Sequence, residues 1–314
     1  MRRHWLTLVG VFLLASQVTP AQGPAWKLRG EGVTTDVVYG HKAGMALTFD
    51  IYRPERPNGA AVISILSGGW RSSWDTMKQF RELPSGSFQL LTAAEIDQAE
   101  GILPSHSYQG LMEKGYTVFA VRHSSSPNFN MPEIVGDVRR AVRFIRAHAP
   151  DWGIDPERIG VWGGSAGGHL SLLLATTSEI GNPKPADEYD RGPAKLAAVV
   201  AYAPPTDLPA ITEFWKQSKQ SFPAVVDLNP ADQKEYSPIQ HVSRDDPPAL
   251  IVHGDQDKTV PYTQGKSMYD ALIKEGAASK LLTVEGAGHG FFGSNAKRVN
   301  LEMVAWFEKY LQKK

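Results

Sequence analysis

The chain has 314 residues, of which 42% are hydrophobic and 21% are charged, and it contains no cysteine. This composition is ordinary for a globular protein, and the absence of cysteine means that the fold is held without disulfides. The 33 acidic and 33 basic residues balance, so no overall field favours nucleic acid or an anionic membrane, and we expect no nucleic-acid partner. The local pair Arg139 and Arg140 falls in a helical pattern and is interpreted as part of a solvated face.

The N-terminal residues have the pattern of a secretory signal peptide. Arg2 and Arg3 precede an apolar run from Trp5 to Ala15, and the small-residue segment SQVTPAQG follows. A transmembrane helix needs roughly 20 apolar residues, so this run favours a cleaved signal over a retained anchor, the alternative. We expect residues 1–21 to be removed after Ala21, no stable membrane insertion, and export to the periplasm or the outside of the cell. A lipid anchor is excluded because there is no cysteine to modify.

Beyond residue 30, apolar runs alternate with segments of helical periodicity. Val33 to Val38 and Ala46 to Tyr52 indicate an opening antiparallel pair, and Ala60 to Leu66 is typical of a buried strand. Further strands are expected at 115–121, 158–162, 196–203, 249–252 and 280–284, and helices at 134–145, 166–177, 264–275 and 296–312. This alternation predicts an α/β fold, with a mostly parallel central sheet covered by helices on both faces. We expect one domain over residues 22–314.

Two long segments interrupt the alternation. Residues 72–106 and 206–238 are Pro-interrupted connections in a fold whose connections are usually short. Insertions of this kind are commonly lids or binding loops. Each follows a strand, so we expect both at the edge of the sheet where the strands end.

One serine interrupts the stretch RIGVWGGSAGGHLSLLLA at 158–175, between a predicted strand and a predicted helix. Ser165 fits two interpretations. It is either a helix N-cap, whose side chain accepts a bond from a free amide, or the centre of a G-x-S-x-G nucleophile elbow. In an elbow, Gly163 and Gly167 relieve crowding around a tight turn that projects the hydroxyl.

An acid and a histidine follow later strands, in the order Ser, Asp, His. HGDQDKTVP comes after the strand at 249–252, and EGAGHGF after the strand at 280–284. Ligands gather at the carboxyl ends of strands in open α/β sheets, so Asp257 or Asp255, together with His289, is expected near Ser165. A serine hydroxyl needs such a base to attack an ester, and the acid would orient the imidazole. The alternatives for these two positions are Asp255, Asp207, Asp155, His253 and His169; we interpret Asp207 as a cap, Asp155 as a turn residue and the two histidines as packing residues.

These motifs resemble the α/β-hydrolase superfamily, within its compact branch of hormone-sensitive-lipase-like and feruloyl or acetylxylan esterase-like enzymes. The resemblance rests on LSGGW at 66–70, GIDPERIGVWGGSAGGHL at 153–170, SPIQHVSRDDPPALIVHGDQDKTVP at 237–261 and GAGHGF at 286–291. It implies an α/β-hydrolase fold with Ser165 as nucleophile, Asp257 as acid and His289 as base, and no cofactor or metal. The expected function is that of a secreted serine carboxylic-ester hydrolase acting on a small acyl, acetyl-sugar or feruloyl-like ester.

The resemblance also implies donors for the oxyanion. The family pattern His-Gly-Gly-Gly-Trp is replaced here by LSGGW, so the first histidine of that pattern is absent. We assign the oxyanion hole to the amides of Gly69 and Ala166, with Gly68 and Trp70 as further candidates. The alternative for the Gly pair is an ordinary tight turn.

Aromatic residues near the expected mouth of the site are candidates for contacts with the substrate. They are Trp70, Trp74, Phe214, Trp215, Phe222 and Phe292. The alternative is that they form the core beneath the two insertions. Two other functions remain open: a serine peptidase of the prolyl-oligopeptidase type, and a binding protein on a hydrolase fold. Dienelactone-hydrolase-type chemistry is excluded because it uses a cysteine.

Overall fold

The computed structural model describes residues 32–72, 80–82, 88–90, 104–178, 188–291 and 293–313. The predicted signal segment, most of the first insertion, and the candidate substrate contacts Trp74 and Phe292 lie outside these ranges. None of the helices in the described ranges is both long and apolar enough to cross a bilayer.

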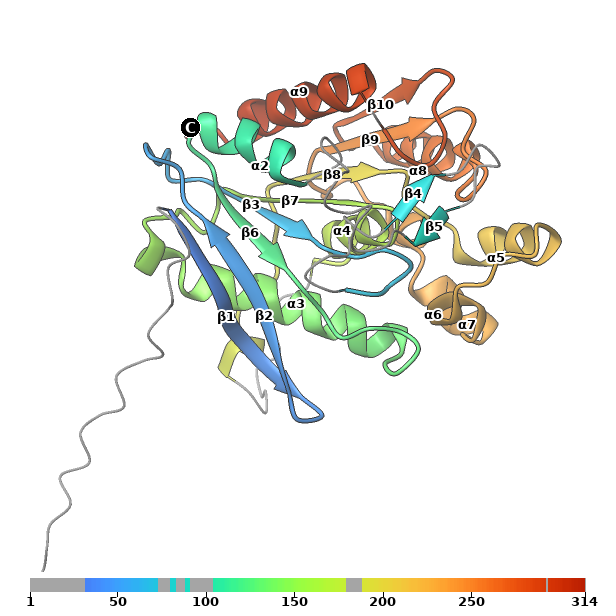
Figure 1. Ribbon diagram of the computed structural model, residues 1–314, viewed down its shortest axis with the longest axis horizontal. Helices are drawn as coiled ribbons and strands as arrows, with labels where there is room; N and C mark the ends of the chain where they lie inside the picture. The colour runs from blue at the N-terminus through green and yellow to red at the C-terminus, as the bar shows by residue number, and fades with distance from the viewer. Residues whose placement is uncertain are drawn as a thin grey trace, which may run out of the picture.

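Within the described residues, eight strands form one central sheet (Figure 1). In spatial order they are β1 (Val33–Lys42), β2 (Met45–Tyr52), β6 (Thr117–Val121), β3 (Ala61–Ile65), β7 (Ile159–Gly164), β8 (Ala198–Tyr202), β9 (Ala249–Gly254) and β10 (Ser279–Val284). β1 and β2 pair antiparallel, as does β2 with β6, and the remaining pairs are parallel. The predicted α/β fold and its opening antiparallel pair are confirmed.

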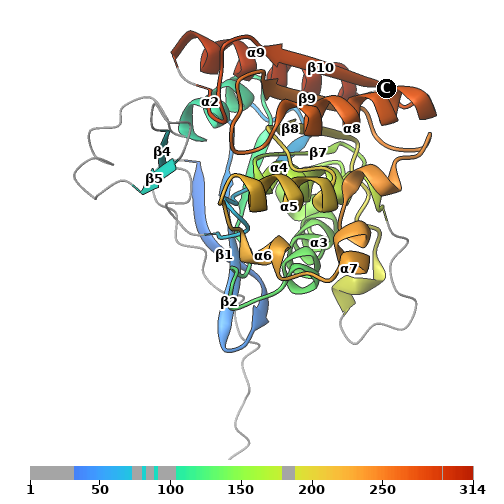
Figure 2. The same cartoon turned by 90° about the vertical axis from the view of Figure 1, so that its right-hand side faces the viewer.

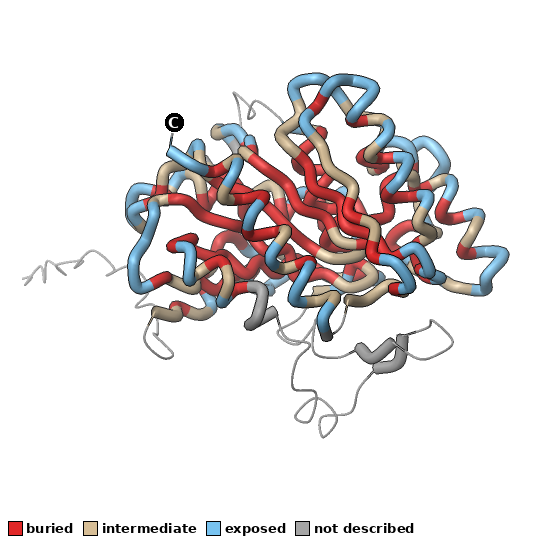
Figure 3. The backbone as a smooth tube through the Cα atoms, turned by 90° about the horizontal axis from the view of Figure 1, so that it is seen from above, coloured by how far each residue is buried: buried red, intermediate tan, exposed pale blue. Residues whose placement is uncertain are grey.

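Helices cover both faces of this sheet (Figure 2). α3 (Met131–Ala147), α4 (Ala166–Thr176) and α8 (Tyr262–Glu275) pack in one core, and α2 (Pro104–Glu113) and α9 (Gly293–Tyr310) pack in the other. Strand β6 is buried on both sides, since Phe119 belongs to the first core and Val118 to the second, which explains the apolar run from Val118 to Val121. The inner strands β6, β3, β7, β8 and β9 are accordingly buried along most of their length, whereas the edge strands β1 and β10 and the helices α3 and α8 mix buried with more exposed residues (Figure 3).

Helix α3 corrects the interpretation of its arginines. The pair at 139 and 140 does not form a solvated face, because Arg140 Nε donates to the carbonyl of Tyr39 (2.8 Å) and Arg139 donates to the hydroxyl of Thr177 (2.7 Å). Both guanidinium groups therefore join α3 to neighbouring segments.

The second predicted insertion is a folded lobe. It contains α5 (Leu208–Gln217), α6 (Pro223–Val226) and α7 (Pro230–Glu235), and it is followed by the 3₁₀ helix η3 (Pro238–His241). The side chains of Leu208, Trp215 and Val225 are buried in the core on the α4 face. The other short elements are β4 (Phe80–Glu82) and β5 (Phe88–Leu90), which pair antiparallel in the first insertion, and the 3₁₀ helices η1 (Ala149–Trp152) and η2 (Glu188–Arg191).

Candidate active site

Ser165 occupies a strained turn between β7 and α4. Its backbone has φ 52° and ψ −120°, and its side chain makes no N-capping bond, so the N-cap interpretation is wrong. A Cβ on Gly163 would lie 2.5 Å from the carbonyl carbon of Gly167, and one on Gly167 would lie 2.6 Å from the oxygen of Ile65. Only glycine fits at either position, because Cβ atoms essentially never approach that closely. The segment therefore has the geometry of the predicted elbow.

Ser165, His289 and Asp257 form a continuous hydrogen-bonded chain. Nδ1 of His289 donates to Oδ2 of Asp257 (2.7 Å), which leaves Nε2 to accept from the hydroxyl of Ser165 (2.9 Å). The loop that carries His289 packs directly on the end of β9, where a Cβ on Gly254 would collide with the backbone oxygens of Ala287 and Gly288. The three residues chosen from the sequence are therefore brought together by the loops after β7, β9 and β10.

Asp257 is buried and fully hydrogen-bonded. Its Oδ1 accepts from the amides of Thr259 (2.8 Å) and Val260 (2.9 Å), and Nε2 of His253 lies 3.4 Å from Oδ2. Burial by itself raises the pKa of Asp257, but the charge and hydrogen bond of His289, together with His253, outweigh it and hold the pKa well below its usual range. Asp257 is thus a carboxylate at neutral pH, which is the form that stabilises an imidazolium.

The other acids are occupied elsewhere. Asp255 accepts from the amide of Gly286 (2.7 Å) and so braces the loop before the histidine. Asp207 is the N-cap of α5 and accepts from the amide of Ala210 (3.1 Å), which confirms the predicted capping role. Asp155 accepts from an amide two residues ahead (3.0 Å), as expected for a turn residue.

The two alternative histidines are buried and hydrogen-bonded within the core, as predicted, and neither contacts Ser165 as a base would. His253 is fully buried and its Nε2 donates to the carbonyl of Val260 (2.8 Å). His169 is also fully buried; Trp70 Nε1 donates to its Nδ1 (3.1 Å), and its Nε2 donates to the carbonyl of Tyr236 (2.7 Å). Burial lowers the pKa of His169 to about 4, so the ring is neutral at physiological pH.

The segment after β3 is a tight two-residue turn. The amide of Gly68 donates to the carbonyl of Arg71 (2.9 Å), and the amide of Arg71 returns a bond to Gly68 (3.0 Å). Gly69 (φ 56°) and Trp70 (φ 58°) both have positive φ, as a type I′ turn requires. The assignment of Gly68 to the oxyanion hole is therefore wrong, because its amide is spent inside the turn.

Three candidate donors remain. No acceptor among the described residues bonds the amides of Gly69, Trp70 or Ala166. The turn also abuts the elbow, since the amide of Gly167 donates to the carbonyl of Ser67 (3.3 Å). The amide of Ala166, the first residue of α4, adds the positive end of the helix to this corner.

Two of the four described candidate substrate aromatics are buried in the core. Trp70 and Trp215 are each 1% exposed, with their ring centroids 6.2 Å apart, and Trp215 Nε1 donates to the carbonyl of Thr259 (2.8 Å). Their assignment as substrate contacts is wrong, and the alternative of a core beneath the insertion holds. Phe214 and Phe222 are half-buried, and a Cβ on Gly69 would lie 3.2 Å from the ring of Phe222.

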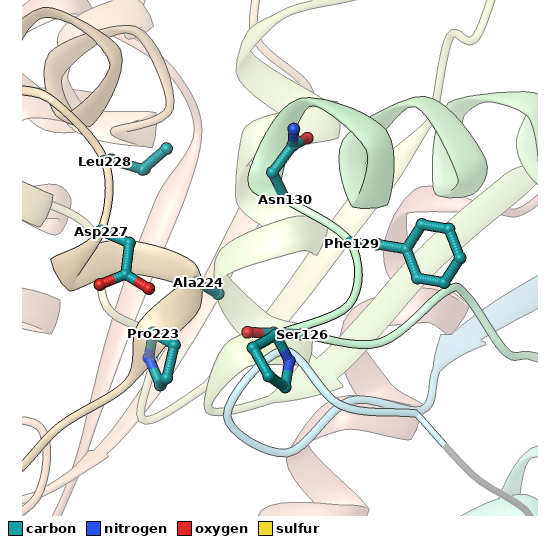
Figure 4. Close-up of a pocket in the computed structure, with 8 residues that line it drawn as sticks. Ser126, Phe129, Asn130, Pro223, Ala224, Asp227 and Leu228 are labelled. Carbon is teal, nitrogen blue, oxygen red and sulfur yellow. The ribbon is translucent and has the colours of Figure 1, made fainter.

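A pocket that the sequence analysis missed adjoins the turn. It has a volume of about 160 Å³ and lies between α6 and the start of α3 (Figure 4). It is lined by Ser126, Pro127, Phe129, Asn130, Pro223, Ala224, Asp227 and Leu228. The amide of Ser126 donates to the carbonyl of Trp70 (3.0 Å), which ties the pocket wall to the turn. The signal for it was positional, since residues 122–130 follow β6 at the same edge of the sheet as the elbow.

The chain is similar to several proteins named as esterases. It is 29% identical over 203 residues to the probable carboxylic ester hydrolase LipM of Mycobacterium tuberculosis, covering 61% of this chain and 44% of that relative. It is 26% identical over 250 residues to an acetylxylan esterase of Xylanibacter ruminicola, covering 77% of this chain and 43% of the relative. A solved truncated form of a carbohydrate esterase from gut microbiota matches with a TM-score of 0.68 and 25% identity, covering 91% of this chain and 100% of that one. The chain thus spans less than half the length of these two curated relatives.

The sequence profile of the BD-FAE family matches residues 96–272, a range that includes β6, the elbow and Asp257 and ends inside α8. The mostly parallel sheet agrees with the fold of the solved carbohydrate esterase. Since more than half of its 314 residues match, the chain belongs to the BD-FAE family, and its fold is that of the α/β hydrolases.

Proposed function

We propose that this protein hydrolyses carboxylic esters through an acyl-enzyme on Ser165. The observation that carries the proposal is the hydrogen-bonded chain from the Ser165 hydroxyl through His289 (2.9 Å) to Asp257 (2.7 Å). The hydroxyl sits on a strained turn, beside amides that have no other acceptor in the described part of the chain. The esterase names of the relatives support the same reaction.

In the first half of the reaction, Oγ of Ser165 adds to the ester carbonyl carbon and its proton moves to Nε2 of His289. The carbonyl π electrons move to oxygen, and the amides of Ala166 and Gly69, with Trp70 as a further candidate, stabilise that oxyanion. Collapse of the tetrahedral intermediate breaks the bond to the alcohol oxygen, which takes the proton from His289. Asp257 keeps the imidazolium oriented throughout and stays ionised.

In the second half, a water molecule replaces the alcohol. His289 removes a proton from the water as its oxygen adds to the acyl carbon, and the same amides receive the oxyanion again. Breaking the acyl–Oγ bond then returns the proton from His289 to Ser165 and releases the carboxylic acid. Every proton transfer in both halves passes through Nε2 of His289, which lies 2.9 Å from the hydroxyl of Ser165.

We propose a short acyl group on a sugar alcohol as the substrate class. The ring of Phe222 lies 3.2 Å from the Cβ position of Gly69 and limits the space beside the turn. The pocket at α6 and α3 combines the apolar residues Pro223 and Ala224 with Asp227, a pairing of apolar surface and hydrogen-bond acceptor suited to a polyhydroxylated ring. The names acetylxylan esterase and carbohydrate esterase among the relatives support this choice.

A single panel of substrates tests the proposal. Wild-type protein and Ser165→Ala are assayed with p-nitrophenyl acetate, butyrate and dodecanoate, an acetylated xyloside, a feruloyl ester and a prolyl anilide. We expect the highest kcat/KM for acetyl esters, with Ser165→Ala reduced about 10⁶-fold in kcat. Retention of a tenth of the ester hydrolysis by Ser165→Ala, or faster cleavage of the anilide than of every ester, would overturn it.

We also propose that the chain is exported. The proposal rests on Arg2, Arg3 and the apolar run from Trp5 to Ala15, with small residues before the expected cut. Cell fractionation combined with N-terminal sequencing tests it. A mature periplasmic or extracellular chain beginning at Gln22 supports export, and a cytoplasmic chain that retains residues 1–21 contradicts it.

A further inference from the structure

His169 is bonded on both sides of its ring. It is fully buried on α4, four residues after Ser165. Nε1 of Trp70 donates to its Nδ1 (3.1 Å), and its own Nε2 donates to the carbonyl of Tyr236 (2.7 Å). An indole N–H only donates and a carbonyl only accepts, so these two partners fix one neutral tautomer.

Trp70 is half of the turn that carries the candidate oxyanion donors. Its φ of 58° is unfavourable for a residue with a side chain, so surrounding contacts must hold it there. Its carbonyl accepts from the amide of Ser126 (3.0 Å), and its indole N–H is bonded only to His169 among the described residues. Leu66, two residues before the turn, has an apolar side chain, and its amide donates to the carbonyl of Val121 (3.0 Å) on β6. The bond to His169 therefore joins the turn to the elbow helix.

We propose that His169 is a positioning residue, which holds the Gly69–Trp70 turn at the distance from Ser165 that oxyanion stabilisation requires. The inference rests on the proposed esterase function. A packing role alone would be met by an apolar ring in this fully buried site, with no bond to Trp70. A histidine supplies an acceptor toward the turn and a donor toward the 206–238 lobe at the same time.

Two substitutions of the same residue separate the two bonds. The amide oxygen of asparagine reaches the place of Nδ1 and keeps an acceptor for Trp70, whereas the amide nitrogen of glutamine reaches the place of Nε2 and keeps the donor for Tyr236. Because misplacing an oxyanion donor slows the chemical step, His169→Gln should lower kcat about 10- to 100-fold with KM within about threefold of wild type. His169→Asn should retain at least about tenfold more kcat than His169→Gln.

The affinity for a transition-state mimic distinguishes the positioning role from a purely structural one, which would leave that affinity unchanged. A methyl trifluoromethyl ketone accepts Oγ of Ser165 at its carbonyl carbon, gives an oxyanion in the turn, and sends the serine proton to His289. Its affinity should fall in His169→Gln by the same factor as kcat. Trp70→Phe removes the indole donor and should lower kcat as much as His169→Gln does. The double variant should have no lower kcat than either single variant, since both substitutions remove the same bond.

The controls separate folding from positioning. Thr176→Val changes another buried polar residue of α4, whose hydroxyl donates only to the carbonyl of Leu172 (3.0 Å), and should leave kcat unchanged. All rates are divided by the number of sites that an organophosphonate labels, so unfolded protein does not count. Equal kcat in the asparagine and glutamine variants, or ketone affinity that does not follow kcat, overturns the positioning role while the esterase function stands. No labelling of Ser165 in wild-type protein overturns both.

Discussion

The two halves of the site are held in place by different means. On the side of the elbow, backbone packs on backbone: a side chain on Gly163 would collide with Gly167, and one on Gly254 with the loop before His289. On the side of the turn, aromatic rings do the packing, with the ring centroids of Trp215 and Phe222 4.5 Å apart and both rings beside Trp70.

This difference separates the residues that carry out the proposed reaction from those that adjust the position of the oxyanion donors. Where backbone packs directly on backbone, there is no room for small shifts. Ser165, His289 and Asp257 therefore keep one geometry as long as the chain folds. Loss of one ring contact or one hydrogen bond allows only a small displacement. Changes around Trp70 therefore shift the oxyanion donors by fractions of an ångström. We therefore expect large losses of activity from the first half and smaller, separable losses from the second.

The largest effect tests the first half. Asp257→Asn removes the acceptor that fixes the tautomer of His289, so kcat should fall about 10⁴-fold. The control is Asp207→Asn, which changes the same side chain at the α5 cap and should alter kcat only modestly. Steady-state rates on p-nitrophenyl acetate measure both, and a larger loss in the Asp207 variant would move the acid to the strand before it.

The next effect concerns the turn. Gly69 has φ 56°, and its Cβ position lies 3.2 Å from Phe222, so Gly69→Val strains the backbone and displaces the donor amide. Losing one oxyanion donor costs roughly 3–4 kcal/mol, so kcat should fall about 10²- to 10³-fold with KM little changed.

The Ser67→Gly variant is the matched control, since the Ser67 hydroxyl is buried with no partner in the described part of the chain, and it should change kcat only slightly. A folded Gly69→Val protein with wild-type kcat sinks the assignment of this donor.

A third effect is on stability. Burial lowers the pKa values of His123 and His169 to about 4, below the ordinary value of 6.5. The unfolded chain therefore binds more protons than the folded chain as pH falls from about 6.5 to about 4, and the free energy of unfolding should drop by roughly 3 kcal/mol per histidine. Below that window the loss is complete, and above it there is none.

Urea unfolding at pH 7, 6, 5 and 4 measures this loss, with His123→Asn as the comparison. Its amide nitrogen takes the place of Nδ1, which lies 2.6 Å from the carbonyl of Ser124. The variant removes one titrating ring, so its unfolding free energy should depend less steeply on pH. Equal slopes for the two proteins are incompatible with a neutral buried His123.

The same division explains how much was predictable from the sequence. Strand β9 is buried at every residue and is read directly from its apolar run, and the spacing of Ser165, Asp257 and His289 follows from short motifs at strand ends. Local motifs specify backbone geometry, and this half of the site depends on little else.

The turn and the aromatics were not predictable in the same way. A pair of glycines predicts a turn, but whether Gly68 or Gly69 keeps a free amide depends on the bond to Arg71. An aromatic residue in a loop faces either inward or outward, and Trp70 and Trp215 become core only when the loop after β3 meets α5. Helix α2 was missed because its first residues, 104–106, belong to the segment interpreted as an insertion, and the rest of the helix lies between that segment and the next predicted strand.

The smallest expected effect belongs to the pocket, whose wall is joined to the turn by the bond from the amide of Ser126 to the carbonyl of Trp70 (3.0 Å) and whose side chains take no part in the proposed chemical steps. If Asp227 accepts from a sugar hydroxyl, Asp227→Asn loses part of one charge-assisted hydrogen bond, which is worth about 1.5 kcal/mol or more. The ratio of kcat/KM for an acetylated xyloside to kcat/KM for p-nitrophenyl acetate should then fall about three- to tenfold. Asp245→Asn makes the same change in charge at an exposed carboxylate outside the pocket and should leave the ratio unchanged. Any change in the chemical step that is common to both substrates cancels in this ratio. An unaltered ratio in Asp227→Asn would therefore mean that the pocket does not bind the sugar.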